Sequence, residues 1–161
     1  MRALLISDTH RYLKNLLEVL ERVGAVDRIF HLGDVEGEEE TIRSLADGIP
    51  VEFVAGNNDF FSHESREKEI MLGDYRVFMT HGHHYGVSTG LSRLEAEGIA
   101  RGAQVVLYGH THRPAIDYRE KLTMVNPGSI SYPRQPGREP SFGMIEVDRR
   151  GEIHFTINYL K

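Results

Sequence analysis

Seven side chains able to bind a metal ion follow apolar runs at five points along the chain. They are Asp8, His10, Asp34, Asn57, His81, His110 and His112. The apolar runs are typical of buried strands, and in open α/β sheets ligands bind beyond the carboxyl ends of the strands. Five strand ends that carry carboxylate, imidazole and amide groups therefore predict one composite site, a centre for two metal ions.

The ligand types and their spacing indicate the metal and its chemistry. Without thiolate, this set suits divalent Mn, Fe, Co, Ni or Zn, and we take Mn as the first choice. On extended backbone, positions i and i+2 point the same way, which would bring Asp8 to His10 and His110 to His112. Two such ions about 3.5–4 Å apart can hold the attacking and leaving oxygens of a phosphoryl transfer.

Composition excludes several other classes of protein. The chain has 161 residues, a net charge of −5 and no cysteine, so disulfides, thiolate zinc sites and cysteine nucleophiles are all excluded. No Lys/Arg run offers an electrostatic track for long nucleic acid. The first apolar run is five residues long, too short for a signal peptide or a membrane span. We expect a cytoplasmic protein with no membrane partner and one domain over residues 1–161, and a homo-oligomer is left open.

The first half of the chain alternates between two hydrophobic periods. Strands are expected at 3–6, around residue 29 and at 51–55, with helices over 13–23 and from about 38 to 46 between them. Strand–helix alternation of this kind predicts an α/β fold with a parallel sheet.

The second half has a different pattern. Gly73-Asp74 separates two apolar strands, which is a hairpin signal. Ser88 is expected to cap a helix with Leu91, Leu94 and Ile99 facing inward. Further strands are expected at 105–108, 122–125, 141–147 and 152–159, and residues 127–140 form a long Pro/Gly-rich loop.

The order of the ligand blocks resembles a known family. Asp8-x-His10, Gly33-Asp34, Gly56-Asn57, His81-Gly82 and Gly109-His110-x-His112 occur in the order typical of calcineurin-like metallophosphoesterases. The chain is similar to the small YfcE-like phosphodiesterase subgroup, including the segment Asn126–Ser129. Each block alone is weak evidence, but all five in order are specific. The resemblance implies a four-layer α/β/β/α sandwich of two packed mixed sheets with the metals at one edge.

The resemblance also implies how the ligands divide. Asp8, His10 and His112 would hold the first ion, and Asn57, His81 and His110 the second, with Asp34 bridging both. A hydroxide between the ions would attack a small phosphodiester in line. Wider relatives place a His, which binds phosphate and protonates the leaving oxygen, where this chain has Asn58. An amide can donate a hydrogen bond but cannot act as a general acid.

The remaining polar residues receive more modest interpretations. Asp59 is grouped with Asp34, Asn58 and His83 as a catalytic residue, although bracing its loop is the favoured role. His83 is assigned a position behind the ligands, with a substitute proton donor or an exposed loop residue as alternatives. His31 is expected to be a packed histidine, His63 solvated and His154 structural. Arg134 is the one loop cation considered for contact with substrate phosphate.

The predicted function is hydrolysis of small phosphodiesters by a metal-dependent enzyme. Two other classes stay open: a non-catalytic interaction scaffold of the same fold, like the retromer subunit, and a nuclease or phosphomonoesterase. A scaffold need not keep every ligand, whereas all seven are present here. The acidic net charge argues against a nuclease that acts on long nucleic acid.

Overall fold

The structure is a computed structural model that describes all residues from 1 to 161. It contains three α-helices, a short 3-10 helix and ten strands. The helices are α1 (Lys14–Val23), α2 (Glu39–Leu45) and α3 (Ser92–Ala100), and the 3-10 helix is η1 (His83–Tyr85). The strands are β1 (Arg2–Ile6), β2 (Arg28–His31), β3 (Val51–Phe53), β4 (Glu67–Leu72), β5 (Tyr75–Thr80), β6 (Val105–Leu107), β7 (Pro114–Tyr118), β8 (Thr123–Pro127), β9 (Ser141–Val147) and β10 (Ile153–Tyr159).

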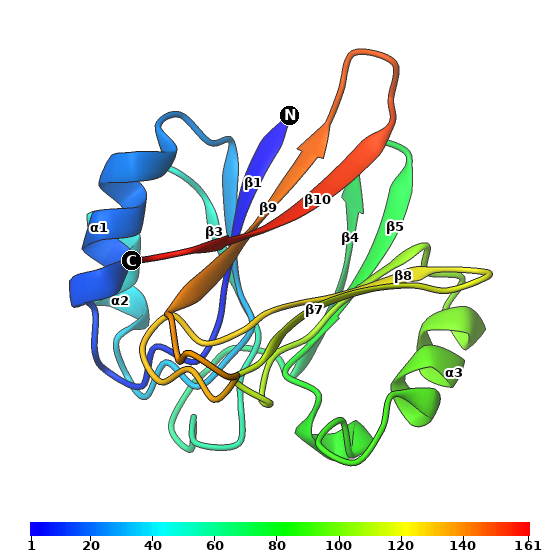
Figure 1. The fold of residues 1–161 in the computed structure, drawn as a ribbon, viewed down its shortest axis with the longest axis horizontal. Coiled ribbons are helices and arrows are strands. Elements are labelled where there is room, and N and C mark those ends of the chain that lie inside the picture. The colour runs from blue at the N-terminus through cyan, green and yellow to red at the C-terminus, as the bar shows by residue number, and fades with distance from the viewer.

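The strands form two mixed five-stranded sheets. The first has the order β10-β9-β1-β2-β3, and the second has the order β4-β5-β6-β8-β7. Within them β1, β2 and β3 run parallel to one another, as do β5, β6 and β8. Figure 1 shows the sheets face to face, with α1 and α2 outside the first and α3 outside the second. This is the predicted four-layer α/β/β/α sandwich.

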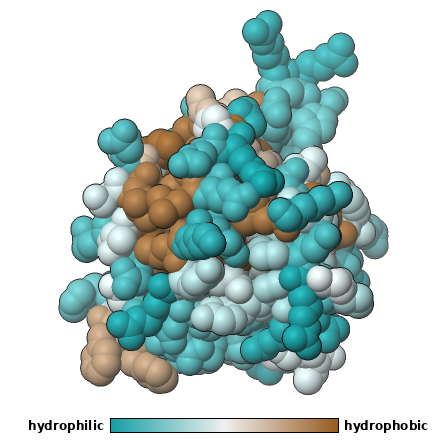
Figure 2. Space-filling view, turned by 60° about the vertical axis from the view of Figure 1, so that its left-hand side comes forward, coloured by the Kyte–Doolittle hydropathy of each residue, from teal (hydrophilic) through white to brown (hydrophobic).

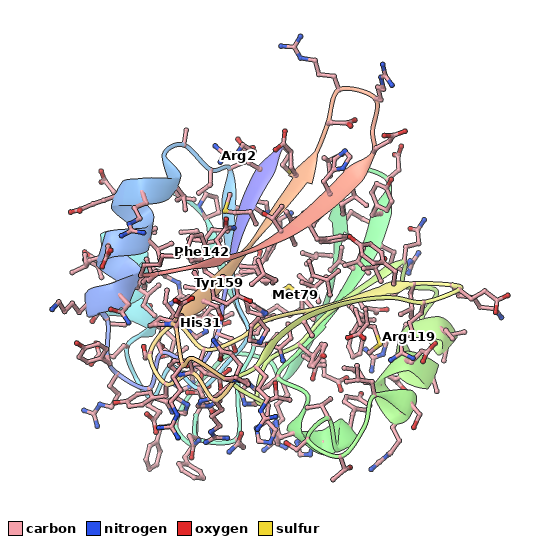
Figure 3. All side chains as sticks on the ribbon, in the orientation of Figure 1. Arg2, His31, Met79, Arg119, Phe142 and Tyr159 are labelled. Atoms are coloured by element: carbon pink, nitrogen blue, oxygen red, sulfur yellow. The ribbon has the colours of Figure 1, made fainter.

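Alternating side chains explain the four layers. Ala3 and Leu5 of β1 lie in the core between the sheets, whereas Leu4 and Ile6 pack in the cluster that contains Leu16 of α1. In β5 the same division places Val77 and Met79 between the sheets and Phe78 under α3. Met79 is visible in the middle of the sandwich in Figure 3. Because β1, β2, β5 and β6 are buried on both faces, these strands, which lead to the ligands, are continuous apolar runs.

The predicted register of α3 is wrong. The helix begins at Ser92 after Leu91, with no side-chain cap, so Ser88 does not cap it. Leu94 and Gly98 form the buried face, and a Cβ on Gly98 would lie 2.6 Å from Cγ2 of Val106. Ile99 lies about 100° further around the helix and is 40% exposed rather than inward-facing. The small residue lets the helix approach the sheet closely, which apolar periodicity does not predict.

Strand β7 has no counterpart in the sequence prediction. It begins with Pro114 and contains no fully buried residue. It pairs only with β8 at the edge of the second sheet. Proline is tolerated on an edge strand because the missing N–H has no ladder partner to lose.

The surface is mainly hydrophilic where Figure 2 shows it, with a large apolar area on the side that carries α1 and α2 and a smaller one at the lower left of the view. Leu17 of α1 is among the exposed large apolar side chains. None of the helices is long and apolar enough to cross a membrane.

Candidate metal centre

The loops that follow β1, β2, β3, β5 and β6 gather at one edge of the sandwich, at the bottom of Figure 1. All seven predicted ligands lie on these loops and come together there. The parallel strands of both sheets point their carboxyl ends to this edge, which is why residues over a hundred positions apart meet. His31, labelled in Figure 3, is the last residue of β2 at this edge.

The first group of ligands consists of Asp8, His10 and His112. Nε2 of His112 lies 3.2 Å from Oδ1 of Asp8, and Nε2 of His10 lies 3.7 Å from the same oxygen. The two Nε2 atoms are 3.1 Å apart. These donor atoms are close enough to share one ion.

The second group consists of Asn57, His81 and His110. Oδ1 of Asn57 lies 3.0 Å from Nε2 of His81 and 3.0 Å from Nδ1 of His110. Asp34 stands between the groups, with Oδ2 3.7 Å from Nε2 of His10 and 3.4 Å from Nε2 of His81. The structure thus assembles the two predicted sets, with Asp34 within reach of both.

The hydrogen bonds of two histidines fix where their lone pairs point. Nδ1 of His81 contacts the carbonyl of Leu32 at 2.6 Å, and Nδ1 of His112 contacts the carbonyl of Tyr132 at 2.6 Å. A carbonyl only accepts, so each Nδ1 carries the proton and the neutral ring directs the Nε2 lone pair into the cluster. Backbone carbonyls commonly orient metal-binding imidazoles in this way.

When these rings are neutral, acceptors face acceptors in the centre of the cluster. Oδ1 of Asp8 is buried without any hydrogen-bond partner, although three histidine Nε2 atoms surround it. Imidazole lone pairs that converge on a carboxylate repel it unless a cation lies between them. The residues present fit divalent ions, because positive charge at this point satisfies the orphan oxygen and the nitrogens together.

The protonation equilibria point to the same need for positive charge. Burial alone would lower the pKa of His81, but the charge of Asp8 and the hydrogen bond with Asp34 raise it to about 9. Burial would raise the pKa of Asp34, but His81 and then Asn58 lower it to about 2. Asp8 behaves likewise, and His81, His10 and His112 hold its pKa well below the usual range.

The prediction that strand alternation brings Asp8 to His10, and His110 to His112, is wrong. Strand β1 ends at Ile6 and β6 at Leu107, before the ligands begin. The ligands on these two loops have positive φ angles: 56° at Asp8, 44° at His10, 70° at His110 and 58° at His112. Tight left-handed turns, not strand alternation, aim these side chains at the centre. Such angles are strained for residues other than glycine and are often found at functional sites.

Two glycines allow the loops to meet. A Cβ on Gly33 would lie 2.7 Å from Nδ1 of His81, and one on Gly56 would lie 2.2 Å from Oδ1 of Asp34. Neither contact is sterically allowed, so any larger residue at these positions would displace a ligand.

Asp59 braces the loops and touches no ligand side chain. Its carboxylate accepts backbone N–H bonds from Asp34, Val35 and Glu36 at 2.7–2.8 Å, and one from Gly56 at 2.7 Å. These contacts join the loop after β2 to the loop after β3. Asn58 contacts Asp34 directly, with its backbone N–H and its side-chain amide each 2.9 Å from a carboxylate oxygen.

His83 lies beside the second group but makes no hydrogen bond to a ligand. Its ring centre is 5.4 Å from that of His81, and its buried Nδ1 has no partner. Burial and then the charge of His81 lower the pKa of His83 to about 4. A hydrogen bond that would orient a ligand is therefore absent, and His83 instead lines a cavity together with Asn57 and Arg66.

The other histidines behave as predicted. His31 is fully buried, with Nε2 3.1 Å from the hydroxyl of Thr9 and Nδ1 accepting from Gly33 N. His63 is exposed. His154 pairs with Asp148 on the β9–β10 hairpin, far from the ligands.

Several groups that contact the ligands were not predicted from the sequence. Ser7 donates to Oδ2 of Asp8 at 2.5 Å, and Ser129 donates to the carbonyl of Asp8 at 2.8 Å. Glu36 lies 3.4 Å from Nδ1 of His10 and can orient that ring. Ser7 and Ser129 lie in the motif blocks, so proximity to a ligand was an available signal. The carbonyls of Leu32 and Tyr132 carry no sequence signal, because every residue has one.

Comparisons with known proteins agree with this geometry. Residues 1–150 match the calcineurin-like phosphoesterase superfamily domain. The probable metallophosphoesterase YsnB of Bacillus subtilis is 33% identical over 149 residues, which cover 92% of this chain and 85% of YsnB. Phosphodiesterase YfcE of Escherichia coli K12 is 36% identical over 81 residues, half of this chain and 40% of YfcE.

Solved structures show the same fold. A conserved Streptococcus pneumoniae protein described as a predicted phosphoesterase superposes with a TM-score of 0.79 at 29% identity, covering 99% of this chain and 97% of that chain. Vps29 of Entamoeba histolytica in complex with Zn²⁺ has a TM-score of 0.75 at 20% identity, over 99% of each chain. The second likeness concerns the fold alone.

The ligand blocks, the paired sheets and the match over residues 1–150 lead to one assignment. The chain belongs to the calcineurin-like phosphoesterase superfamily.

Proposed function

We propose that this protein is a metal-dependent phosphodiesterase that hydrolyses small phosphodiesters. The observation that carries the proposal is a buried oxygen of Asp8 that has no hydrogen-bond partner and is surrounded by the Nε2 atoms of three histidines within the cluster of candidate ligands. The similarity to YfcE, a protein named as a phosphodiesterase, supports the reaction class. Manganese is the first choice of metal, with Fe, Co, Ni and Zn as alternatives.

The residues divide as their positions suggest. Asp8, His10 and His112 would hold one ion, Asn57, His81 and His110 would hold the other, and Asp34 would be shared between them because it lies near both groups. When bound, two such ions lower the pKa of water to yield a nucleophile and neutralise the charge of the transferred phosphoryl group. Leu32 and Tyr132 hold the imidazoles of His81 and His112 in the metal-binding tautomer.

Asn58 orients the bridging carboxylate and can turn its amide to a phosphate oxygen. It cannot protonate a leaving alcohol, so the alcohol must depart nearly as an alkoxide. We therefore propose that esters with acidic leaving groups are the better substrates. His83 lies in the adjoining cavity and has a lowered pKa, so any help that it gives to the reaction would come from its neutral imidazole.

A diester is the preferred substrate because of its charge. At neutral pH a diester carries one negative charge and a monoester close to two. No Lys or Arg side chain bonds to a ligand in the cluster, so the second charge of a monoester has no dedicated partner at the centre.

The experiment measures metal content and hydrolysis together. We expect two divalent ions per chain after reconstitution, and hydrolysis of bis(p-nitrophenyl) phosphate that disappears on chelation and returns with Mn²⁺. With the same metal and pH, kcat/KM for this diester should exceed that for p-nitrophenyl phosphate. Activity that survives thorough metal removal would overturn the mechanism, and a clear monoester preference would indicate a small phosphatase instead.

The scaffold function is the second candidate, favoured by the fold shared with Vps29. A scaffold would bind protein partners and would show no turnover even with metal bound. Two bound ions without hydrolysis of any diester would therefore favour it over the phosphodiesterase.

A further inference from the structure

A cavity opens directly beside the first group of ligands. Its volume is about 590 Å³, and its lining includes the metal ligands His10 and His112 together with Tyr132, Arg134 and Arg138. A substituent of any ester held at the centre can extend into this space. Arg134 was considered from the sequence, whereas Arg138 was not.

The loop that carries both arginines is tied to the ligands. His112 donates through Nδ1 to the carbonyl of Tyr132 at 2.6 Å, and Arg134 donates its backbone N–H to the carbonyl of His112 at 3.0 Å. Tyr132 N–H also reaches Oγ of Ser129 at 2.8 Å, and that hydroxyl bonds to the carbonyl of Asp8. The backbone from 129 to 134 is therefore fixed relative to the first group.

The two arginines in the lining of this cavity have no acidic partner. Neither Arg134 nor Arg138 forms an ion pair, whereas Arg43 and Arg101 elsewhere each bind two carboxylates. Glu36 is the one acidic residue in the lining, and its carboxylate lies 3.4 Å from Nδ1 of His10. In a chain with a net charge of −5, two free guanidinium groups beside metal ligands form a local positive field.

We propose that Arg134 and Arg138 form a subsite for a second anionic group on the substrate. The substrate class is then a small phosphodiester whose substituent bears a further phosphate or carboxylate. Guanidinium groups suit such oxygens, because their planar N–H donors match phosphate and carboxylate geometry. The ring of Tyr132, which is 51% exposed and edge-on to His10, supplies an aromatic wall for the atoms that link the two anions. This inference rests on the proposed function and specifies its substrate.

Binding can be measured without turnover. The metal-loaded protein is titrated calorimetrically with thymidine 3′,5′-bisphosphate and with thymidine 5′-monophosphate, which differ only in the second anion. We expect the bisphosphate to bind about 10-fold more tightly, the size of one or two charge-assisted hydrogen bonds in an open site. Arg134→Gln and Arg138→Gln should each reduce this advantage about threefold, and the double variant should abolish it.

Arg149→Gln is the matched control. Arg149 is exposed on the β9–β10 hairpin and forms no ion pair, so the variant makes the same charge change far from the cavity. The melting temperature of all variants should equal that of the wild type, because the loop is held by backbone groups. Equal affinity for the two nucleotides in the wild type, or an advantage that survives in the double variant, would overturn the subsite.

Turnover separates this inference from the proposed function. The 5′-(p-nitrophenyl) ester of thymidine 3′,5′-bisphosphate should have a higher kcat/KM than the ester without the 3′-phosphate, and this advantage should shrink in each single variant and disappear in the double variant. If bis(p-nitrophenyl) phosphate is not hydrolysed at all, the phosphodiesterase proposal fails. If it is hydrolysed normally but the 3′-phosphate gives no advantage, the subsite alone fails.

Discussion

Two clusters of acidic and histidine side chains lie at opposite ends of the sandwich. At the ligand edge, Asp8 and its neighbours are buried, and one carboxylate oxygen lacks any donor. On the β9–β10 hairpin, Asp148, Glu152 and His154 also lie within reach of one ion, but Glu152 and His154 are exposed. There Asp148 accepts from His154 at 2.8 Å and from two backbone N–H groups. The hairpin cluster is satisfied by its own donors, whereas the buried cluster needs positive charge, from a bound cation or from a protonated histidine.

The comparison teaches that ligand types alone do not make a metal site. Burial removes water as a partner, so lone pairs in the first cluster can be satisfied only by a bound cation or by protonation. Exposed groups in the hairpin cluster can replace a lost partner with a hydrogen bond to water at little cost in free energy. The following predictions test this difference, beginning with the largest expected effect.

Asp34→Asn should reduce kcat/KM for bis(p-nitrophenyl) phosphate by more than about 100-fold, since even supporting residues around a metal cost 10–100-fold. The Asp34 carboxylate lies close to both groups, so the metal content should fall below that of the wild type. Asp148→Asn is the control and should change neither value. Equal losses in the two variants would remove the distinction between the clusters.

Asp59→Ala should lower the free energy of unfolding by about 2–4 kcal/mol, because four backbone N–H groups lose their acceptor. Urea denaturation of the metal-free protein measures this directly. Asp59→Asn should lose less stability, because its one carbonyl oxygen can still accept some of these N–H bonds. Unchanged stability in Asp59→Ala would show that the brace is dispensable and leave only a direct catalytic role.

Asn58→His should raise the rate on diesters with poor leaving groups by roughly 10–100-fold, a fraction of the usual contribution of general acid catalysis. The rate on nitrophenyl esters should change little, since nitrophenolate leaves without a proton. The measurement is the slope of log kcat against leaving-group pKa, which should become shallower in the variant. A wild-type enzyme with no such slope, when chemistry limits the rate, would contradict the role given to Asn58.

His154→Asn should produce the smallest effect, and a pH-dependent one. The hydrogen bond with Asp148 raises the pKa of His154 above its value in the unfolded chain. The pair therefore stabilises the fold below the unfolded pKa of about 6.5 and loses this effect as pH rises through the folded pKa. The melting temperature of the variant should be lower by roughly 1 °C at about pH 5 and unchanged near pH 9. A deficit that persists at high pH would show that the contact does not depend on charge.

Much of the architecture could be predicted from local patterns. The apolar runs of β1, β2 and β6 and the periodicity of Leu16 and Val19 in α1 identify these elements, because their burial leaves a periodic trace. Strand β7 and the register of α3 leave no such trace, since one is a half-exposed edge and the other depends on Gly98 fitting against Val106. The assignment of residues 1–161 to one domain stays a prediction.

The sequence by itself determined the chemical set: seven candidate ligands of suitable types in a specific order, with an amide at position 58. Only the tertiary structure decided how they act together. Left-handed turns at Asp8 and His110 aim the side chains, carbonyls of Leu32 and Tyr132 fix the lone pairs, and Asp59 joins the two loops. These features depend on backbone angles and on contacts between distant segments, and such contacts exist only once the two sheets have packed.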